Sequence, residues 1–489
     1  MDIHAKKIFV RSVQRGVTVL MVVAFMGIFL IVMGTITSFA FVEARYGRAL
    51  YDREQALHSA EAGLEYYRWF LSHFSNNLTN GTGQAGPYTY TINDPETGTL
   101  IGTAGISVVG NVQCSVIQSI DLTAVGRSNL NPGYPRTLFA RYMQPSVAGY
   151  SYLLNSNVLA GSDRIITGPY FSNGGIRMDG TNYSDVSSAV SSWVCDSSYN
   201  CSPTQHNAPG VLGSGSGSSL WHYPVSSIDF AGITTGLSNL KTYVRNNGGV
   251  YVAPASGSID QRGYHLIFRS DGTVDVYRVT STTNVPAYST QYGWQTEYSI
   301  IAGQTFVANY AIPSGCSVIF VEDRAWVEGI ISKKTTVAVA DFVNSNNSPS
   351  AYLMGNITDT TYDGSVGLSV IAEGDVLIPL NSPDTMELHG IFVAQNGHYG
   401  RNFYTNDSSY SSQYRVGSAW SSYVMRTKLT TIGTVVSNGR TGTAWQCGSS
   451  TCSGYQSRVD SYDELQATNP PPFTPAASPN FQFVLWKEQ

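Results

Sequence analysis

Charged residues are scarce in this chain of 489 residues. Asp, Glu, Lys and Arg make up 12% of it, about half the share usual in a soluble globular protein. The formal net charge is −5, so the chain offers no basic footprint for nucleic acid, and no nucleic-acid partner is predicted. Hydrophobic residues still make up 42% and aromatic residues 12%, which excludes a largely disordered chain.

The motifs of common enzyme chemistry are missing from the sequence. It contains no P-loop, no dinucleotide-binding fingerprint and no zinc-protease helix motif. His389 lies on a predicted strand, and no motif places a Ser or Cys nucleophile beside it. We interpret His389 as a hydrogen-bonded or surface group, and predict no enzyme activity, no catalytic residue, no cofactor and no metal site.

Cysteine is sparse as well. The six cysteines are Cys114, Cys195, Cys201, Cys316, Cys447 and Cys452. Two pairs are close in sequence, 195 with 201 and 447 with 452, and each follows a tryptophan by two residues. Local disulfides in these polar loops fit an oxidising compartment. Free thiols and a metal site are the alternatives, although a metal would need further soft ligands near each pair. The sequence does not decide how Cys114 and Cys316 are paired.

One long uncharged run stands near the N-terminus. Residues 17–42 read VTVLMVVAFMGIFLIVMGTITSFAFV, and about 20 such residues span a bilayer as a helix. Four basic residues precede the run, so the N-terminus is expected to stay in the cytoplasm. A secretory signal peptide cleaved near Ala40 is the alternative, but its apolar region covers only about 7–15 residues.

The helical pattern continues beyond the uncharged run. Residues 43–75 form an amphipathic segment without proline, and Asn76, Asn77 and Gly81 are expected to end it. Leucine recurs every seven residues, and further apolar residues follow three positions later. The predicted apolar seam consists of Leu50, Leu57, Ala60, Leu64, Tyr67 and Leu71.

Two stretches of this helix resemble type IV pilins and pseudopilins. The segment from Gly16 and Val17 to Met21, GVTVLM, resembles the site of prepilin peptidase, where a basic leader ends in Gly. Residues 59–66, SAEAGLEY, are similar to the AEAGLEY stretch of PilX-type minor pilins. The resemblance covers residues 11–70, about an eighth of the chain. It implies a leader over residues 1–16, cleaved so that Val17 becomes the new N-terminus.

Met21 departs from the pattern of that family. Most pilins carry a Glu at the fifth mature position, where it is thought to pair with the N-terminus of a neighbouring subunit. A Met side chain has no charge for such a pair. Some minor pilins and pseudopilins placed first at the tip also lack the Glu. The resemblance therefore implies a tip or initiating subunit.

The rest of the chain is predicted to be β-rich. Residues 76–145 are expected to form a small β domain packed on the helix. Residues 146–468 show glycines after short apolar strands at steps of about 16–26 residues, which favours a solenoid-like surface domain. A β-sandwich is the alternative. An insertion is predicted near 229–280, with a helix over residues 229–247 and then a hairpin that turns at Asp271-Gly272. Residues 469–489 are predicted to form a Pro-rich C-terminal tail.

The combined interpretation is a mainly β protein with one long N-terminal α-helix. The resemblance implies a minor pilin or pseudopilin that is a single-pass inner-membrane precursor and later part of a cell-surface filament. Its partners would be prepilin peptidase, other pilins through the helix, and a surface glycan or protein ligand. The alternative is a membrane-anchored β-solenoid polysaccharide hydrolase or lyase, because paired carboxylates on such a scaffold cleave glycans.

Overall fold

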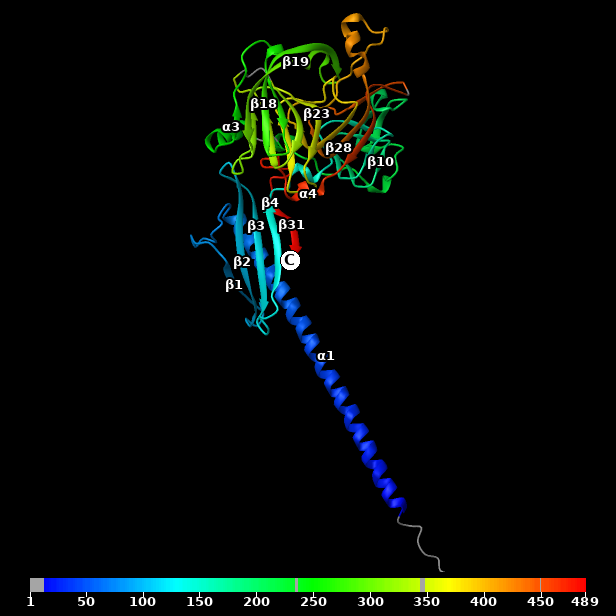
Figure 1. Cartoon of the computed structure of the whole chain (residues 1–489). Coiled ribbons are helices and arrows are strands. Elements are labelled where there is room, and N and C mark those ends of the chain that lie inside the picture. Colours follow the sequence, from blue (N-terminus) through cyan, green and yellow to red (C-terminus); the bar gives the residue numbers. More distant parts are fainter. Residues whose placement is uncertain (1–12, 234–235, 344–347, 449) are drawn as a thin grey trace, which may run out of the picture. The chain divides into compact units, whose positions relative to one another are not determined.

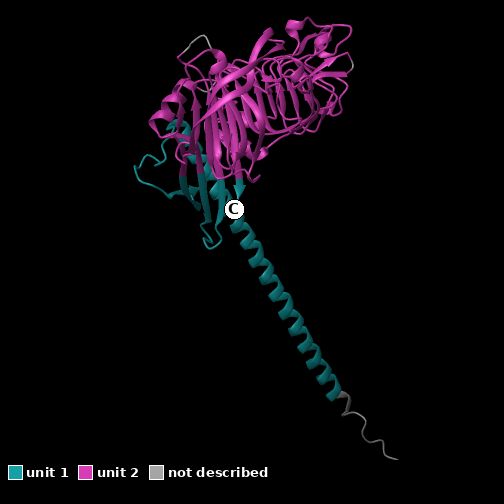
Figure 2. Cartoon of the chain, turned by 45° about the horizontal axis from the view of Figure 1, so that its top comes forward, with its two compact units in different colours: residues 1–108, 122–139, 487–489 teal, residues 109–121, 140–486 magenta. Residues whose placement is uncertain are grey.

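The computed structural model describes residues 13–233, 236–343, 348–448 and 450–489 (Figure 1). Strands hold 43% of the described residues, and one long helix occupies the N-terminal part. The predicted class, mainly β with one long N-terminal helix, is therefore confirmed. The chain divides into two compact units (Figure 2). Unit 1 comprises residues 1–108, 122–139 and 487–489, and unit 2 comprises residues 109–121 and 140–486.

Unit 1 is built on helix α1 (Val13–His73), which has 61 residues and a length of about 90 Å at 1.5 Å per residue. Asn76, just beyond its end, has a left-handed backbone with φ 63°, which stops the helix. A five-stranded sheet follows, and some of its strands continue into unit 2. Its order is β1 (Tyr88–Asn93), β2 (Leu100–Gln113), β3 (Val116–Ser128), β4 (Arg136–Met143) and β31 (Gln482–Glu488).

The helix approaches the sheet closely because small residues face each other. A Cβ atom added at Gly126 of β3 would lie 1.9 Å from the carbonyl oxygen of Ala56 on α1. A Cβ atom at Gly63 of α1 would lie 2.6 Å from the side chain of Ala104 on β2. Larger side chains at these glycines would push the helix away from the sheet.

Unit 2 contains a stack of parallel strands, as a solenoid requires. Adjacent members pair in parallel along the whole stack. The parallel pairing favours the solenoid-like alternative over the sandwich. The order is β15 (Trp221–His222), β11 (Val186–Ser188), β8 (Tyr170–Ser172), β5 (Tyr152–Leu154), β28 (Met425–Ser437), β26 (Thr385–Ala394), β24 (Gly367–Ala372), β22 (Lys334–Val339), β20 (Val318–Val321) and β16 (Val250–Val252).

The chain enters this stack in its middle. It runs from β5 outward to β15, crosses to the opposite end at β16, and returns through successive strands to β28. There Val435 of β28 pairs with Tyr152 of β5. The crossing segment carries α2 (Phe230–Ile233) and α3 (Leu237–Asn246). The solenoid is thus completed by strands that lie far apart in sequence.

Further strands complete the sides of the solenoid. One parallel series is β17 (Tyr264–Phe268), β21 (Ala325–Ile331), β23 (Ala351–Asp359), β25 (Val376–Leu377) and β27 (Tyr399–Gly400). A second joins β28 to β30 (Ser450–Ser461), β7 (Ile165–Ile166) and β10 (Thr181–Asn182). A third is β6 (Val158–Ala160), β9 (Ile176–Met178) and β14 (Val211–Leu212).

Antiparallel hairpins and short helices decorate this scaffold. The hairpins are made by β18 (Thr273–Ser289) with β19 (Gly293–Ala311), β12 (Ser192–Cys195) with β13 (Gln205–Pro209), and β29 (Ala444–Cys447) with β30. The short helices are α4 (Glu464–Thr468) and the 3-10 turns Val147–Gly149, Ser197–Tyr199, Ser218–Leu220, Ile259–Gln261, Ser412–Tyr414 and Ser418–Tyr423.

The central strands of the main stack are buried on both faces. All four residues of β20 are buried, and Val318 and Phe320 face a second hydrophobic cluster outside the solenoid interior. Helix α3 covers this outer cluster with Leu237, Leu240 and Val244. Burial on both faces explains the continuous apolar runs of the parallel strands.

The predicted helix over residues 229–247 is two shorter helices, α2 and α3, and residues 234–235 lie outside the described residues. The predicted hairpin follows at Asp271-Gly272, where β17 and β18 pair with Phe268 opposite Val274. However, β17 also pairs in parallel with β21. Residues 264–280 therefore belong to the solenoid sheet, a pairing that local sequence patterns do not reveal.

Candidate functional site

The first half of α1 presents an uninterrupted apolar surface. Every residue from 16 to 48 is exposed in the isolated chain, with Leu20 74% and Phe25 70% exposed. Within the described residues, α1 has the length and composition needed to cross a membrane. An exposed apolar patch of this extent requires lipid or protein neighbours.

The predicted processing site lies at the start of this surface. Gly16 and Val17 are helical and exposed, and a Cβ atom built at Gly16 meets nothing within 4 Å. The predicted leader falls largely on residues 1–12, which lie outside the described residues. Met21 is 58% exposed on the same helix. Its thioether carries no charge, so it offers no ion-pair partner to a neighbouring chain.

The second half of α1 buries one face against the sheet of unit 1. Four predicted seam residues are buried, namely Ala60, Leu64, Tyr67 and Leu71. The other two lie elsewhere: Leu57 is half-buried and Leu50 is 43% exposed. A straight helix has 3.6 residues per turn, so a strict seven-residue repeat drifts around it by about 20° per heptad. The buried stripe instead begins at Asp52 and Ala56.

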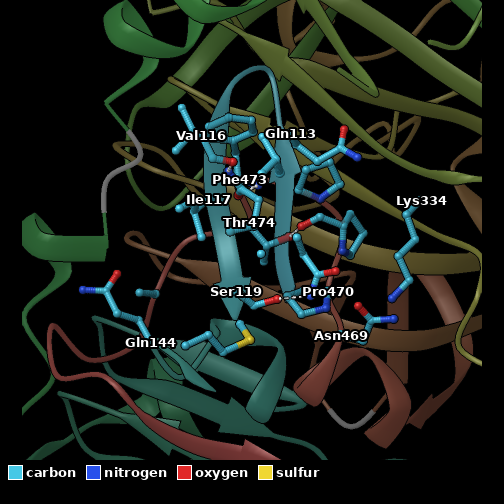
Figure 3. A pocket seen from close by; sticks show the side chains of 18 of the residues that line it. Gln113, Val116, Ile117, Ser119, Gln144, Lys334, Asn469, Pro470, Phe473 and Thr474 are labelled. Carbon is cyan, nitrogen blue, oxygen red and sulfur yellow. Dashed lines mark hydrogen bonds between the residues drawn. The ribbon is translucent and has the colours of Figure 1, made fainter. Parts of the chain in front are cut away.

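Unit 2 has a cavity of about 520 Å³ beside the tip of the β2–β3 hairpin (Figure 3). We call it the hairpin cavity; its lining includes Val116, Ile117, Phe473 and the segment 469–474. Several polar groups of the lining are already paired. Phe473 donates its amide to Gln118 Oε1 at 2.9 Å, and Gln113 Oε1 accepts from the Ser317 amide at 3.0 Å. The Pro-rich segment is thus tied to β3 by a hydrogen bond from the main chain of Phe473 to the side chain of Gln118.

Lys334, at the start of β22, also lines the hairpin cavity (Figure 3). Its Nζ is buried and has no hydrogen-bond partner among the described residues. Burial, reinforced by the positive charge of Arg141, lowers the pKa of Lys334 from 10.5 to about 7. A partly neutral amine therefore lies in this cavity near neutral pH. No motif in the sequence points to Lys334, although two adjacent lysines at the start of an apolar strand place their side chains on opposite faces, so that one of them points inward.

A second cavity, of about 240 Å³, is lined by four carboxylates: Glu297, Asp323, Asp341 and Asp375. We call it the acidic cavity. Burial raises the pKa of Asp323, although its carboxylate accepts hydrogen bonds from the Arg324 and Ala255 amides. The carboxylate of Glu297 accepts hydrogen bonds from Asn402 and Tyr404, both at 2.7 Å. A carboxyl group whose pKa is raised, close to further carboxylates, is one part of the arrangement that glycan hydrolysis uses.

His389 is 2% exposed and is held by two carboxylates. Its Nε2 lies 2.6 Å from Glu387 and its Nδ1 lies 3.7 Å from Asp359. Burial opposes a charge on the ring, but hydrogen bonds and attraction to Asp359 and Glu387 outweigh it and raise the pKa of His389. The ring is thus part of a buried polar network of the solenoid.

Three disulfides occur in unit 2. Cys195 pairs with Cys201 and Cys447 with Cys452, and the third joins Cys114 to Cys316 across 202 positions of sequence. This third bridge ties the tip of the β2–β3 hairpin to the residues before β20. Among the described residues, no group of three or more His, Cys, Asp and Glu side chains is arranged to hold a metal ion.

No protein-family model matches the sequence. No curated protein matches it either. Among solved structures, the chain is similar to the crystal structure of the competence-associated pilin ComZ from Thermus thermophilus. The alignment covers 90% of this chain and 97% of that chain at 11% identity, with a TM-score of 0.29. A likeness of this size carries no argument about function.

Proposed function

We propose that this chain is a minor pilin or pseudopilin of a type IV pilus-like filament, with unit 2 as its adhesive or interaction domain. One observation carries the proposal. A single unbroken helix has an uncharged, exposed segment over residues 17–42, while its second half buries one face against the sheet of its own unit. Such a helix serves as a membrane anchor before assembly and as a packing surface afterwards.

The uncharged half of α1 suits both environments. In the inner membrane, residues 17–42 hold the precursor as a single span with its basic end in the cytoplasm. In a filament, the same side chains pack against the helices of neighbouring subunits in place of lipid. This exchange requires a span without charge, because a carboxylate or ammonium group would need a partner in both environments.

The N-terminal sequence supports the finer parts of the proposal. Gly16-Val17 resembles the cleavage site of prepilin peptidase, and Met21 lacks the charge that most pilins offer to a neighbour. A subunit of this kind starts or caps a filament and elongates it poorly. We therefore expect few copies per filament.

Mass spectrometry of the protein from cell membranes tests this proposal. Cleavage between Gly16 and Val17 predicts a mature chain that begins at Val17. A Gly16→Leu variant should keep the full precursor length, whereas a Gly34→Leu variant within the same helix should be processed normally. A native chain that begins at Met1, or at Phe41 after signal-peptide cleavage, would contradict the proposal.

A second candidate function is cleavage of surface polysaccharide at the acidic cavity. The raised pKa of Asp323 beside three further carboxylates is the observation that favours it. Release of new reducing ends from a glycan panel by the purified protein would support this function. The Asp323→Asn variant should then abolish the release, whereas activity that survives the substitution would exclude Asp323 as the acid.

A further inference from the structure

We propose that a third cavity in unit 2 binds an acidic sugar residue, one whose pyranose ring carries a carboxylate. The cavity measures about 500 Å³, within the range of small-molecule sites. We call it the arginine cavity; the lining residues that define it are Tyr288, His398, Arg401, Arg440, Trp445 and Arg458. The proposal names a ligand class for the domain that the proposed function displays, and in that sense it rests on that function.

The lining of the arginine cavity is basic. Three arginines line it, and no Asp or Glu occurs among its described lining residues, although the chain as a whole is acidic. Arg458 is neutralised by Asp163, which accepts from its Nε at 2.8 Å and its Nη2 at 2.6 Å. His398 lies 2.8 Å from the carboxylate of Asp375. Arg401 and Arg440 form no ion pair among the described residues, although Glu297 attracts the charge of Arg401 and Asp196 attracts that of Arg440.

Arg440 presents its guanidinium with few competing partners. Its Nη2 donates to the carbonyl oxygen of Ser198 at 2.5 Å, and the group lies over the ring of Tyr199, 4.2 Å from the ring centre. These contacts fix the plane of the guanidinium and do not neutralise it. A planar, oriented guanidinium binds a carboxylate through two parallel hydrogen bonds.

Arg401 adds a buried positive charge to the cavity wall. It is 1% exposed, donates to the carbonyl oxygens of Leu380, Tyr423 and Val424, and its Nε has no partner among the described residues. Its hydrogen-bond acceptors are neutral carbonyls, and Glu297 attracts its charge without accepting a hydrogen bond from it among the described residues. A cation buried in this way is costly. A ligand carboxylate in the adjacent cavity reduces the free-energy cost of burying this charge, so this side of the cavity favours the binding of an anion.

Two aromatic rings in the lining of the arginine cavity provide surfaces on which a sugar ring can pack. Tyr288 and Trp445 are half-buried, and their ring centres lie 5.9 Å apart at 71°. The Trp445 Nε1 donates to the carbonyl oxygen of Arg401 at 2.8 Å, so the indole is oriented by the same residue that carries the buried charge. Such rings offer flat apolar faces with polar edges, which suit the apolar face and hydroxyl groups of a pyranose.

Two disulfides flank the cavity from distant parts of the sequence. The loop closed by Cys195 and Cys201 contributes Ser198 and Asn200 to the lining, and Gln446 directly precedes Cys447 of the second bridge. Cross-linked walls lose less conformational freedom when a ligand binds. Their hydroxyl and amide groups add hydrogen-bonding capacity for sugar hydroxyls.

The observations favour a sugar over other anions. Inorganic phosphate would use the arginines and leave the aromatic rings without a partner. A nucleic acid is an extended polyanion, and outside this cavity it would meet a chain with a net charge of −5. A sugar acid has a carboxylate for the arginines and an apolar ring face for the aromatic side chains. A single residue of this kind makes both contacts within the cavity.

The proposal can be tested by calorimetric titration of the purified full-length protein in detergent. The ligands are two β-1,4-linked sugar tetramers, one of glucuronic acid and one of glucose, which differ only at carbon 6. The acidic tetramer should bind at least about tenfold more tightly, and its affinity should fall as salt is added. Arg440→Gln should remove this preference, and Arg440→Lys should restore part of it. Arg245→Gln is the matched control, because Arg245 also lies over a tyrosine ring, at 5.0 Å from Tyr251, outside the cavity.

Equal affinity for the two tetramers, or acidic binding that survives Arg440→Gln, would overturn the proposal. So would full competition by inorganic phosphate at the affinity of the tetramer, or tighter binding of a single-stranded oligonucleotide. The titration uses the purified chain alone, so its failure leaves the processing at Val17 and filament assembly unaffected. Equally, a chain that is never processed at Gly16 could still bind the acidic tetramer.

Discussion

Lys334 carries an amine that is buried without a hydrogen-bond partner among the described residues. Its amine has a pKa of about 7 in the folded protein, below its ordinary value of 10.5. Between these two pH values the unfolded chain binds more protons than the folded one, so the free energy of unfolding rises with pH. Lys334→Met should remove this rise. It should also stabilise the protein at pH 7 by about 1–3 kcal/mol, the cost of a buried polar group without a partner.

Chemical unfolding at pH 7 and pH 9 measures both effects. Lys333→Met is the matched control, since Lys333 is exposed and its Nζ donates to the Ile312 carbonyl at 3.1 Å. It should leave the pH dependence unchanged. A Lys334→Met protein that is less stable than the native one at pH 7 would mean that the amine has a partner in solution.

His389 should contribute to stability in the opposite pH range. Its pKa is raised in the folded state by Asp359 and Glu387, so the folded protein binds the proton more tightly than the unfolded chain. The contribution is complete below the unfolded pKa of about 6.5 and is lost as pH rises through the folded pKa. The loss of unfolding free energy caused by His389→Gln should therefore be larger at pH 5.5 than at pH 8.5. An equal loss at both values would contradict the assigned partners.

At the scale of elements, the docking of α1 on its sheet depends on the absence of side chains. Gly126→Ala places a methyl group against the helix backbone at Ala56, and overpacking of this kind costs about 1–3 kcal/mol. Gly105→Ala is the control on the same sheet, because its Cβ atom would meet only the Val125 carbonyl at 3.9 Å. Thermal unfolding should show a lower Tm for Gly126→Ala alone. Equal melting of the two variants would mean that the helix is not held at this spacing.

At the scale of the whole molecule, Met21 is expected to limit how often the subunit enters a filament. In the pilins that its N-terminus resembles, a Glu at this position pairs with a neighbouring N-terminus. Met21→Glu should therefore raise the share of this protein in sheared filaments, measured by quantitative proteomics. Met26→Glu should lower it, because a carboxylate there has no partner in the apolar span. A native protein that is already the most abundant pilin would contradict the tip assignment.

The sequence by itself determined the elements that depend on local physics. An uncharged run followed by a seven-residue repeat specified one long helix, and Asp271-Gly272 specified the turn between β17 and β18. Each of these signals lies within a few residues of the structure it describes, because helix periods and turn conformations are local properties.

Only the tertiary structure decided which distant segments meet. Val435 pairs with Tyr152, and Cys114 is bonded to Cys316. The two residues of each pair lie so far apart in sequence that no local sequence pattern predicts the pairing. The same holds for the buried amine of Lys334 and for the arginines that converge between two disulfide loops. Burial and charge balance are properties of the assembled solenoid, because a side chain loses its water only when strands from elsewhere in the chain close around it.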